Sequence, residues 1–178
     1  MRRCSTHRGG FASISALVLA SGLLLVGRPA DANEDCPAPP GPHCRSVKGK
    51  FHSAPPPTCA SPVGFCTAGE LTGNLRGSYA FVMTTLGSSN VRELPGVFFY
   101  TGQSVVTLRG GAPGTLLGID TGTVDLEPTG THAMAAILTI SGGTGTQARK
   151  QGHLVLRGKL DLESGEVDGD YQGEVCEP

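Results

Sequence analysis

HLVLRGKLDL, residues 153–162, alternates apolar and polar side chains. Its apolar positions are Leu154, Leu156, Leu160 and Leu162. A repeat of two residues is typical of a β-strand with one buried and one solvated face. After the short segment ESG at 163–165, residues 167–175 alternate in the same way. The two stretches therefore predict an antiparallel β-hairpin.

The same pattern continues toward the N-terminus. Runs of β-branched and aromatic residues recur between glycine-rich turns, at 71–83, 97–100, 105–108, 115–119 and 133–140. None of these stretches has the 3.6-residue repeat of an amphipathic helix. Glycines inside the strands favour the bends of a small closed barrel. We therefore predict an all-β domain, folded as a small antiparallel closed barrel.

The first 32 residues have the three parts of a secretory signal peptide. Arginines at 2, 3 and 8 precede an apolar run at 11–26, and Ala30-Asp31-Ala32 is a small-x-small cleavage site. The apolar run is shorter than the roughly 20 residues of a spanning helix. We expect cleavage after Ala32 and no stable membrane insertion afterwards. The expected location is secreted or periplasmic.

Residues 33–64 are rich in proline and cysteine, with CPAPPGP at 36–42 and three prolines at 55–57. Proline lacks a backbone donor and fixes φ, so such a stretch is not expected inside a sheet. We predict that 33–64 is a leader or covering strap outside the barrel core. The barrel domain is then 65–178, and the chain after the signal peptide has the size of one domain.

The charge balance argues against one class of partner. The chain has 14 basic and 15 acidic residues, and the signal peptide contains four of the former and one of the latter, which leaves a net charge of −4. Phosphate recognition needs a clustered basic surface. The longest basic run is Arg149-Lys150. We therefore expect no nucleic-acid partner.

A glycine-rich loop before the 153–162 strand carries a family resemblance. The segment ISGGTGTQARKQG, residues 140–152, resembles the Gly-Gly-Thr-Gly signature of the allene oxide cyclase and dirigent barrel superfamily. Supporting segments lie at 69–73, 77–81, 98–102 and 114–122. The loop departs from many relatives at 146–150, TQARK, where it is more polar. Bacterial secreted members look similar over roughly residues 59–176, and the resemblance implies eight antiparallel strands and a mostly apolar lumen.

Five cysteines remain after the signal peptide, and exported chains usually pair them. In a closed antiparallel barrel with an even number of strands, the first strand starts beside the end of the last. We therefore predict a disulfide from Cys176 to Cys66 or Cys59, and a small-loop disulfide between Cys36 and Cys44, with one cysteine left over. The cysteines and histidines show no tight Cys-x-x-Cys pair, so we expect no metal and no cofactor.

The sequence is less specific about chemistry. It contains no Gly-x-Ser-x-Gly and no His-Glu-x-x-His motif. The resemblance implies a cyclase or isomerase whose lumenal carboxylate and polar side chains orient an apolar substrate. The candidate catalytic residues are Glu70, Tyr100, Asp120 and Glu127. Each is also compatible with a solvated strand or turn position, and no convergent catalytic set can be assembled.

The favoured hypothesis is therefore a non-enzymatic barrel that binds a small apolar ligand or a partner protein. Its candidate ligand-binding residues are Tyr79, Phe81, Tyr100 and Leu156. The cyclase or isomerase, and a purely structural exported domain, stay open as alternatives, and the oligomeric state is not set. The inward candidates that decide how full the lumen is are Leu75, Tyr79, Phe81, Leu154, Leu156 and Leu160. Facing inward they could fill a narrow barrel, and facing outward they would leave a pocket of roughly a few hundred Å³. We expect a partly open, apolar lumen.

Overall fold

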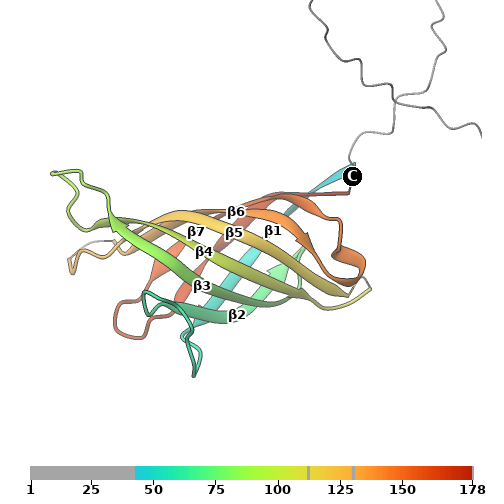
Figure 1. Ribbon diagram of the computed structural model, residues 1–178, viewed down its shortest axis with the longest axis horizontal. Helices are drawn as coiled ribbons and strands as arrows, with labels where there is room; N and C mark the ends of the chain where they lie inside the picture. The colour runs from blue at the N-terminus through green and yellow to red at the C-terminus, as the bar shows by residue number, and fades with distance from the viewer. Residues whose placement is uncertain (1–42, 112, 130, 178) are drawn as a thin grey trace, which may run out of the picture. The chain divides into compact units, whose positions relative to one another are not determined.

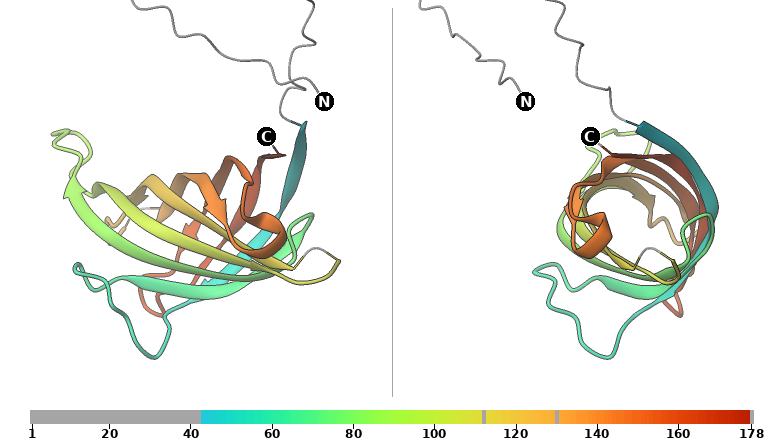
Figure 2. Two further views of the ribbon diagram at one scale, coloured as in Figure 1. Left: turned by 45° about the vertical axis from the view of Figure 1, so that its right-hand side comes forward. Right: turned by 90° about the vertical axis from the view of Figure 1, so that its right-hand side faces the viewer.

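The structure is a computed structural model that describes residues 43–111, 113–129 and 131–177. These residues form eight strands: β1 (His43–Ala54), β2 (Cys66–Gly73), β3 (Gly77–Ser88), β4 (Val97–Leu108), β5 (Gly114–Asp125), β6 (Ala133–Gly143), β7 (Gln151–Leu160) and β8 (Val167–Glu177). Each strand pairs with the next in antiparallel fashion, and β8 pairs with β1 (Figure 1). The right-hand view of Figure 2 looks along the closed barrel. The predicted all-β, eight-stranded antiparallel barrel is confirmed.

Regular structure other than strands is minimal in the described ranges. A single turn of 3₁₀ helix, η1 (Gly145–Gln147), follows β6 in the glycine-rich loop. Among the residues described, no helix has the length and apolar character needed to cross a membrane. The two runs at 97–100 and 105–108 belong to one long strand, because Gly102 and Ser104 continue the inward positions between them.

The first strand lies inside the segment expected to be a leader. β1 pairs with β2 on one side and with β8 on the other, so it is an internal strand. No proline occurs between Pro42 and Pro55, and Val47, Phe51 and Ser53 alternate into the lumen. The barrel therefore begins at residue 43 and not at 65, which corrects the expected boundary. Prolines end this strand without interrupting it. The signal peptide, its cleavage site and residues 33–42 lie outside the described residues.

Inward side chains fill the middle of the lumen. The buried cluster contains all six of the large residues considered for this role: Leu75, Tyr79, Phe81, Leu154, Leu156 and Leu160. Tyr171 is only 1% exposed, and its hydroxyl accepts a hydrogen bond from the Leu75 N–H at 2.8 Å. The same hydroxyl donates to the Thr72 carbonyl at 2.8 Å. Tyr171 thus joins β8 to the β2–β3 turn, and this part of the barrel is packed.

Some inward glycines make room for an aromatic ring on the neighbouring strand. Gly122 lies opposite Tyr100 in the β4–β5 pair, and a Cβ at Gly122 would lie 2.7 Å from the Tyr100 hydroxyl oxygen. Gly169 lies opposite Phe51 in the β1–β8 pair, and its Cβ would lie 2.7 Å from that ring. Any larger residue would displace these rings. The strand glycines therefore seat the aromatic side chains of the lumen.

The described residues contain two disulfides, and both predicted pairings are wrong. Cys44 bonds to Cys176, and Cys59 bonds to Cys66. A disulfide does cross the closure seam, but its first cysteine lies on β1, in the segment predicted to be a leader. Cys44 lies near the start of β1, directly opposite Cys176 near the end of β8. Cys36 lies outside the described residues.

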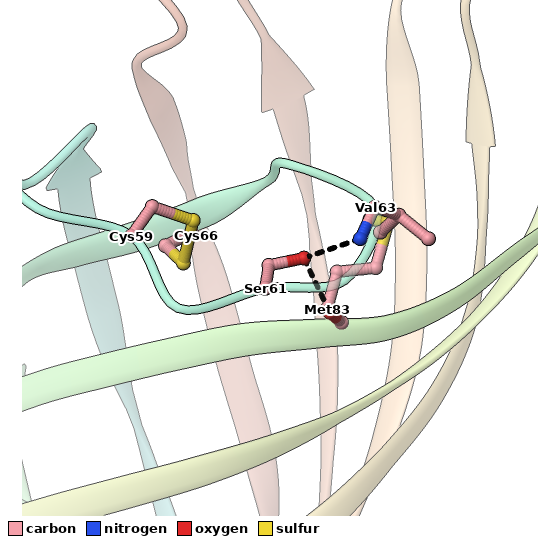
Figure 3. Close-up of a disulfide and its surroundings, with 5 residues drawn as sticks. All are labelled: Cys59, Ser61, Val63, Cys66 and Met83. Atoms are coloured by element: carbon pink, nitrogen blue, oxygen red, sulfur yellow. Dashed lines mark hydrogen bonds between the residues drawn. A yellow bond between two sulfur atoms is a disulfide. The ribbon is translucent and has the colours of Figure 1, made fainter.

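The second disulfide and a set of hydrogen bonds hold the β1–β2 loop against β3, as Figure 3 shows. Ser61 Oγ donates to the Met83 carbonyl at 2.6 Å and accepts from the Val63 N–H at 3.1 Å. The Met83 N–H in turn donates to the Phe65 carbonyl at 3.1 Å. These contacts position the Phe65 ring at one end of the barrel.

Candidate functional site: a cavity at one end of the lumen

A cavity of about 80 Å³ lies at the end of the barrel where β3, β5 and β7 finish. Leu86, Leu126 and Leu160 line it at this end. The other lining residues are Phe51, Ser53, Phe65, Thr67, Tyr79, Phe81, Met83, Tyr100, Asp120, Val124, Met134, Ala136, Leu156 and Val167. Most of the cavity wall is apolar. The packed core lies between the cavity and the other end of the barrel.

Aromatic rings give the cavity a defined shape. The Phe81 ring meets the Tyr100 ring edge-on, with centroids 5.8 Å apart. The Phe65 ring meets Phe81 in the same way at 6.5 Å. Met83 and Met134 also line the cavity. Methionine side chains are flexible and adaptable, so they allow this end of the lumen to adjust its volume.

A buried polar cluster interrupts the apolar wall. Asp120 on β5 is 1% exposed and Ser104 on β4 is 2% exposed. The Ser104 hydroxyl lies beside the Asp120 carboxylate and lowers the pKa of that carboxyl. Ser104 Oγ also lies 3.3 Å from the hydroxyl oxygen of Tyr79 on β3. Three adjacent strands therefore place a carboxylate, a hydroxyl and a phenol together beneath the cavity.

Two buried oxygen atoms at the cavity have no hydrogen-bond partner within the described part of the chain. They are Asp120 Oδ2 and Ser53 Oγ. Both residues line the cavity, and each is 1% exposed. A buried polar atom without a partner costs about 1–3 kcal/mol, and more when it is charged. Such atoms in a cavity wall are places where a bound molecule can present a polar group.

Burial also sets the protonation of this cluster. Loss of solvent raises the pKa of Asp120 to about 6, and the Ser104 hydroxyl opposes part of this rise. Burial, together with the negative charge of Asp120, raises the pKa of Tyr79 and of Tyr100. At neutral pH the Asp120 carboxylate is therefore mostly ionised and accepts hydrogen bonds, while both phenols keep their protons.

The structure brings together two of the four candidate catalytic residues. Tyr100 and Asp120 both line the cavity, whereas Glu70 and Glu127 do not. Glu70 points outward from β2 and pairs with Arg109 at 3.0 Å on the exposed surface. Glu127 lies in the loop after β5. The expectation of lumenal roles for Glu70 and Glu127 is therefore wrong, because the alternation of β2 turns Glu70 to solvent and Glu127 lies beyond the end of β5.

The four candidate ligand-binding residues, Tyr79, Phe81, Tyr100 and Leu156, all line the cavity. Sequence reasoning missed Ser104 and Ser53. Ser104 shares the inward positions of Tyr100 along β4, so the alternation could have identified it. Ser53 was missed because its segment was assigned to the leader.

The residues described contain one group with the spacing of a metal site, formed by Cys44, Glu174 and Cys176. Its two sulfur atoms are bonded to each other. A disulfide offers no thiolate, and thiolates are what bind metal ions. This group is therefore a structural crosslink.

Comparisons of the chain with protein-family models, with curated proteins and with solved structures found no match. The resemblance to the allene oxide cyclase and dirigent superfamily stays a sequence-based expectation.

Proposed function

We propose that the barrel binds a small, mostly apolar molecule in the cavity. This molecule carries a donor group from which the Asp120 carboxylate accepts a hydrogen bond. The observation that carries this proposal is the unpartnered Asp120 Oδ2, buried in an otherwise apolar wall. A hydroxyl or an amine would supply the missing hydrogen bond. A hydrocarbon of the same shape would leave the charge unpaired.

The cavity volume limits the size of the group that is enclosed. A single water molecule needs about 10–15 Å³ of cavity volume. The cavity of about 80 Å³ therefore admits a small ring or a branched alkyl group. A larger ligand has to extend past Leu86 at the barrel end or move Met83 and Met134. We therefore expect one ring or chain end to be buried against Asp120.

A matched pair of probes tests this proposal. Phenol has a donor and anisole, its methyl ether, has none, so isothermal titration of the purified full chain should show saturable one-to-one binding that favours phenol. The Asp120→Asn variant should lose most of this preference. Equal affinity of wild-type protein for both probes would contradict the role of Asp120, and no binding of either would contradict the binding function.

Two neighbouring alanines on β6 provide a control for the cavity itself. Ala136 lines the cavity and is 5% exposed, while Ala135 points to solvent. Ala136→Leu should fill part of the cavity and weaken both probes, and Ala135→Leu should change neither. A urea titration checks that both variants fold, and Ala136→Val is the milder substitution if the larger one does not. Undiminished binding in the folded Ala136 variant would place the site elsewhere.

A second candidate function is proton-transfer catalysis, as in a cyclase or isomerase. A carboxylate with a pKa of about 6 beside a protonated tyrosine is suited to act as a general base. Cyclohex-3-enone is a small probe for this: Asp120 would remove the proton between the carbonyl and the alkene and return it to the far alkene carbon. The expected rate rises as the pH rises through about 6 and is lost in Asp120→Asn. A rate equal to that in buffer would contradict the catalytic function and would not bear on the binding function.

We also propose that the protein is exported, to the periplasm or the cell exterior. The two disulfides are compatible with an oxidising compartment, and the N-terminal pattern supports a cleaved signal peptide. Mass analysis of the exported chain should find Asn33 at its N-terminus. An intact leader on that protein would contradict the proposal.

A further inference from the structure

The outer surface of the barrel is divided by charge. Positions 78–84 of β3, 99–107 of β4, 115–123 of β5 and 133–141 of β6 present no charged side chain outward, since Asp120 faces the lumen. We call the outward positions of these four segments the uncharged face. The other strands have ordinary charged outer positions, among them Lys50 on β1, Arg157 and Lys159 on β7, and Asp170 on β8. The outer face of a solvated antiparallel sheet normally carries polar and charged side chains, as these other strands do.

Five of the ten large apolar side chains that are exposed in the described residues lie on the uncharged face, and the others lie in loops or near the end of β3. Ile119 is 56% exposed, Ile137 is 51%, Phe99 is 54% and Leu117 is 41%. Single exposed apolar residues are common on protein surfaces. Large contiguous apolar patches mark interaction surfaces. The question is therefore whether these residues are neighbours on the sheet.

The strand register makes Leu117, Ile119 and Ile137 contiguous with the exposed Val105, whereas Phe99 lies opposite Thr123, outside this group. Val105 on β4 lies opposite Leu117 on β5, and Ile119 is two residues further along the same side of β5. Ile119 lies opposite Thr139 and Thr121 lies opposite Ile137, so Ile119 and Ile137 are diagonal neighbours within side-chain reach. An apolar band therefore crosses three strands, with threonines beside it.

The area fits a weak protein interface. The segments of the uncharged face contain seven residues on β3 and nine on each of β4, β5 and β6. At about 3.3 Å per residue and about 4.8 Å between strands, they cover roughly 540 Å² of sheet. Standard interfaces bury about 600–1,000 Å² on each partner, and weaker associations bury less. The uncharged face is just below the standard range.

We propose that the uncharged face is a self-association interface, which packs against the same face of a second copy of this chain. Like meets like without burying any charge, which a partner with a charged surface could not achieve. The threonines also favour self-pairing, because each hydroxyl both donates and accepts a hydrogen bond. The barrel is closed, so the contact is made by side chains and not by strand addition. An isologous contact of this kind gives a two-fold dimer.

Sedimentation equilibrium of the purified chain over about 1–100 µM tests the proposal. The wild type should approach twice the monomer mass as concentration rises. Ile119→Lys, which places a charge in the centre of the band, should remain monomeric over the same range. Gln172→Lys on the outward side of β8 is the matched control and should associate like the wild type.

Each outcome bears on the proposal. Monomeric wild type at every concentration would overturn it, even if another protein were found to bind this face. Association of Ile119→Lys equal to that of the wild type would also overturn it. Because Ile119 is mostly exposed in the monomer, its replacement should leave the urea midpoint of the monomer unchanged. The ligand experiments are independent of this result, because the cavity and the uncharged face lie on opposite sides of the barrel wall.

Discussion

Burial of Asp120 makes a specific prediction about stability and pH. The pKa of this carboxyl is raised from its ordinary value of 3.8 to about 6, so between these values the folded chain holds a proton that the unfolded chain has released. A raised carboxyl pKa contributes stability below pH 3.8 that is lost as the pH rises through about 6. A rise of about two pH units corresponds to about 3 kcal/mol. Asp120→Asn keeps the shape of the side chain and removes the titration.

The expected result is a difference between two curves. The free energy of unfolding of the wild type, minus that of Asp120→Asn, should fall by about 2–2.5 kcal/mol between pH 4 and pH 7, because part of the total change lies below pH 4, and it should change little above pH 7. Urea titrations at half-unit steps measure it, with tyrosine fluorescence as the signal because the chain has three tyrosines and no tryptophan.

Asp125→Asn is the control with the opposite sign. Hydrogen bonds from the backbone N–H groups of Glu127 and Thr131 lower the pKa of Asp125. Its contribution is therefore present above pH 3.8 and is lost as the pH falls through the lowered pKa. The free energies of unfolding of the wild type and of Asp120→Asn should not run parallel from pH 4 to pH 7. Parallel curves would refute the inference that Asp120 is buried without a compensating partner.

Two further predictions concern what holds the barrel closed. Removing the Cys44–Cys176 disulfide, which spans 132 residues, should lower the free energy of unfolding by about 4–5 kcal/mol, against about 2–3 kcal/mol for Cys59–Cys66, which spans 7. Urea midpoints of the paired Cys→Ser variants in the opposite order would contradict the closure argument. Tyr171→Phe should cost about 1–3 kcal/mol, because it leaves a buried backbone N–H without its acceptor. A loss below about 0.5 kcal/mol in the same titration would show that the N–H finds another partner.

Local pattern was enough to identify an all-β fold. The alternation at 153–162 and 167–175 corresponds to β7 and β8, and the earlier runs correspond to strands as well. A two-residue repeat shows that alternate side chains share one face of a strand, and that information is local. The number of strands came from the family resemblance and not from this pattern. The same repeat is present in β1, but the proline-rich segments on both sides favour a leader there, where the structure has a strand of twelve residues.

The candidate site was only half predictable, because facing inward is a local property and meeting at one height of the lumen is not. Asp120 and Tyr100 were found by residue type, but so were Glu70 and Glu127, which lie outside the cavity. Ser104 became part of the site because the β3–β4 and β4–β5 registers pair it with Phe81 and Gly118, which makes Tyr79 and Asp120 its diagonal neighbours.

Sequence alone therefore determined the all-β fold class and the alternation of side chains along the strands, and it predicted disulfides in this chain. The tertiary structure decided which cysteines pair, which carboxyl is buried and which uncharged strand segments lie side by side on the outer surface. The reason is the closure of the sheet: β1 meets β8 across more than a hundred residues of chain, and the barrel wall turns one side of every strand away from water. Burial then raises the pKa of Asp120 and leaves one of its oxygens without a partner, and neither property belongs to any local stretch of sequence.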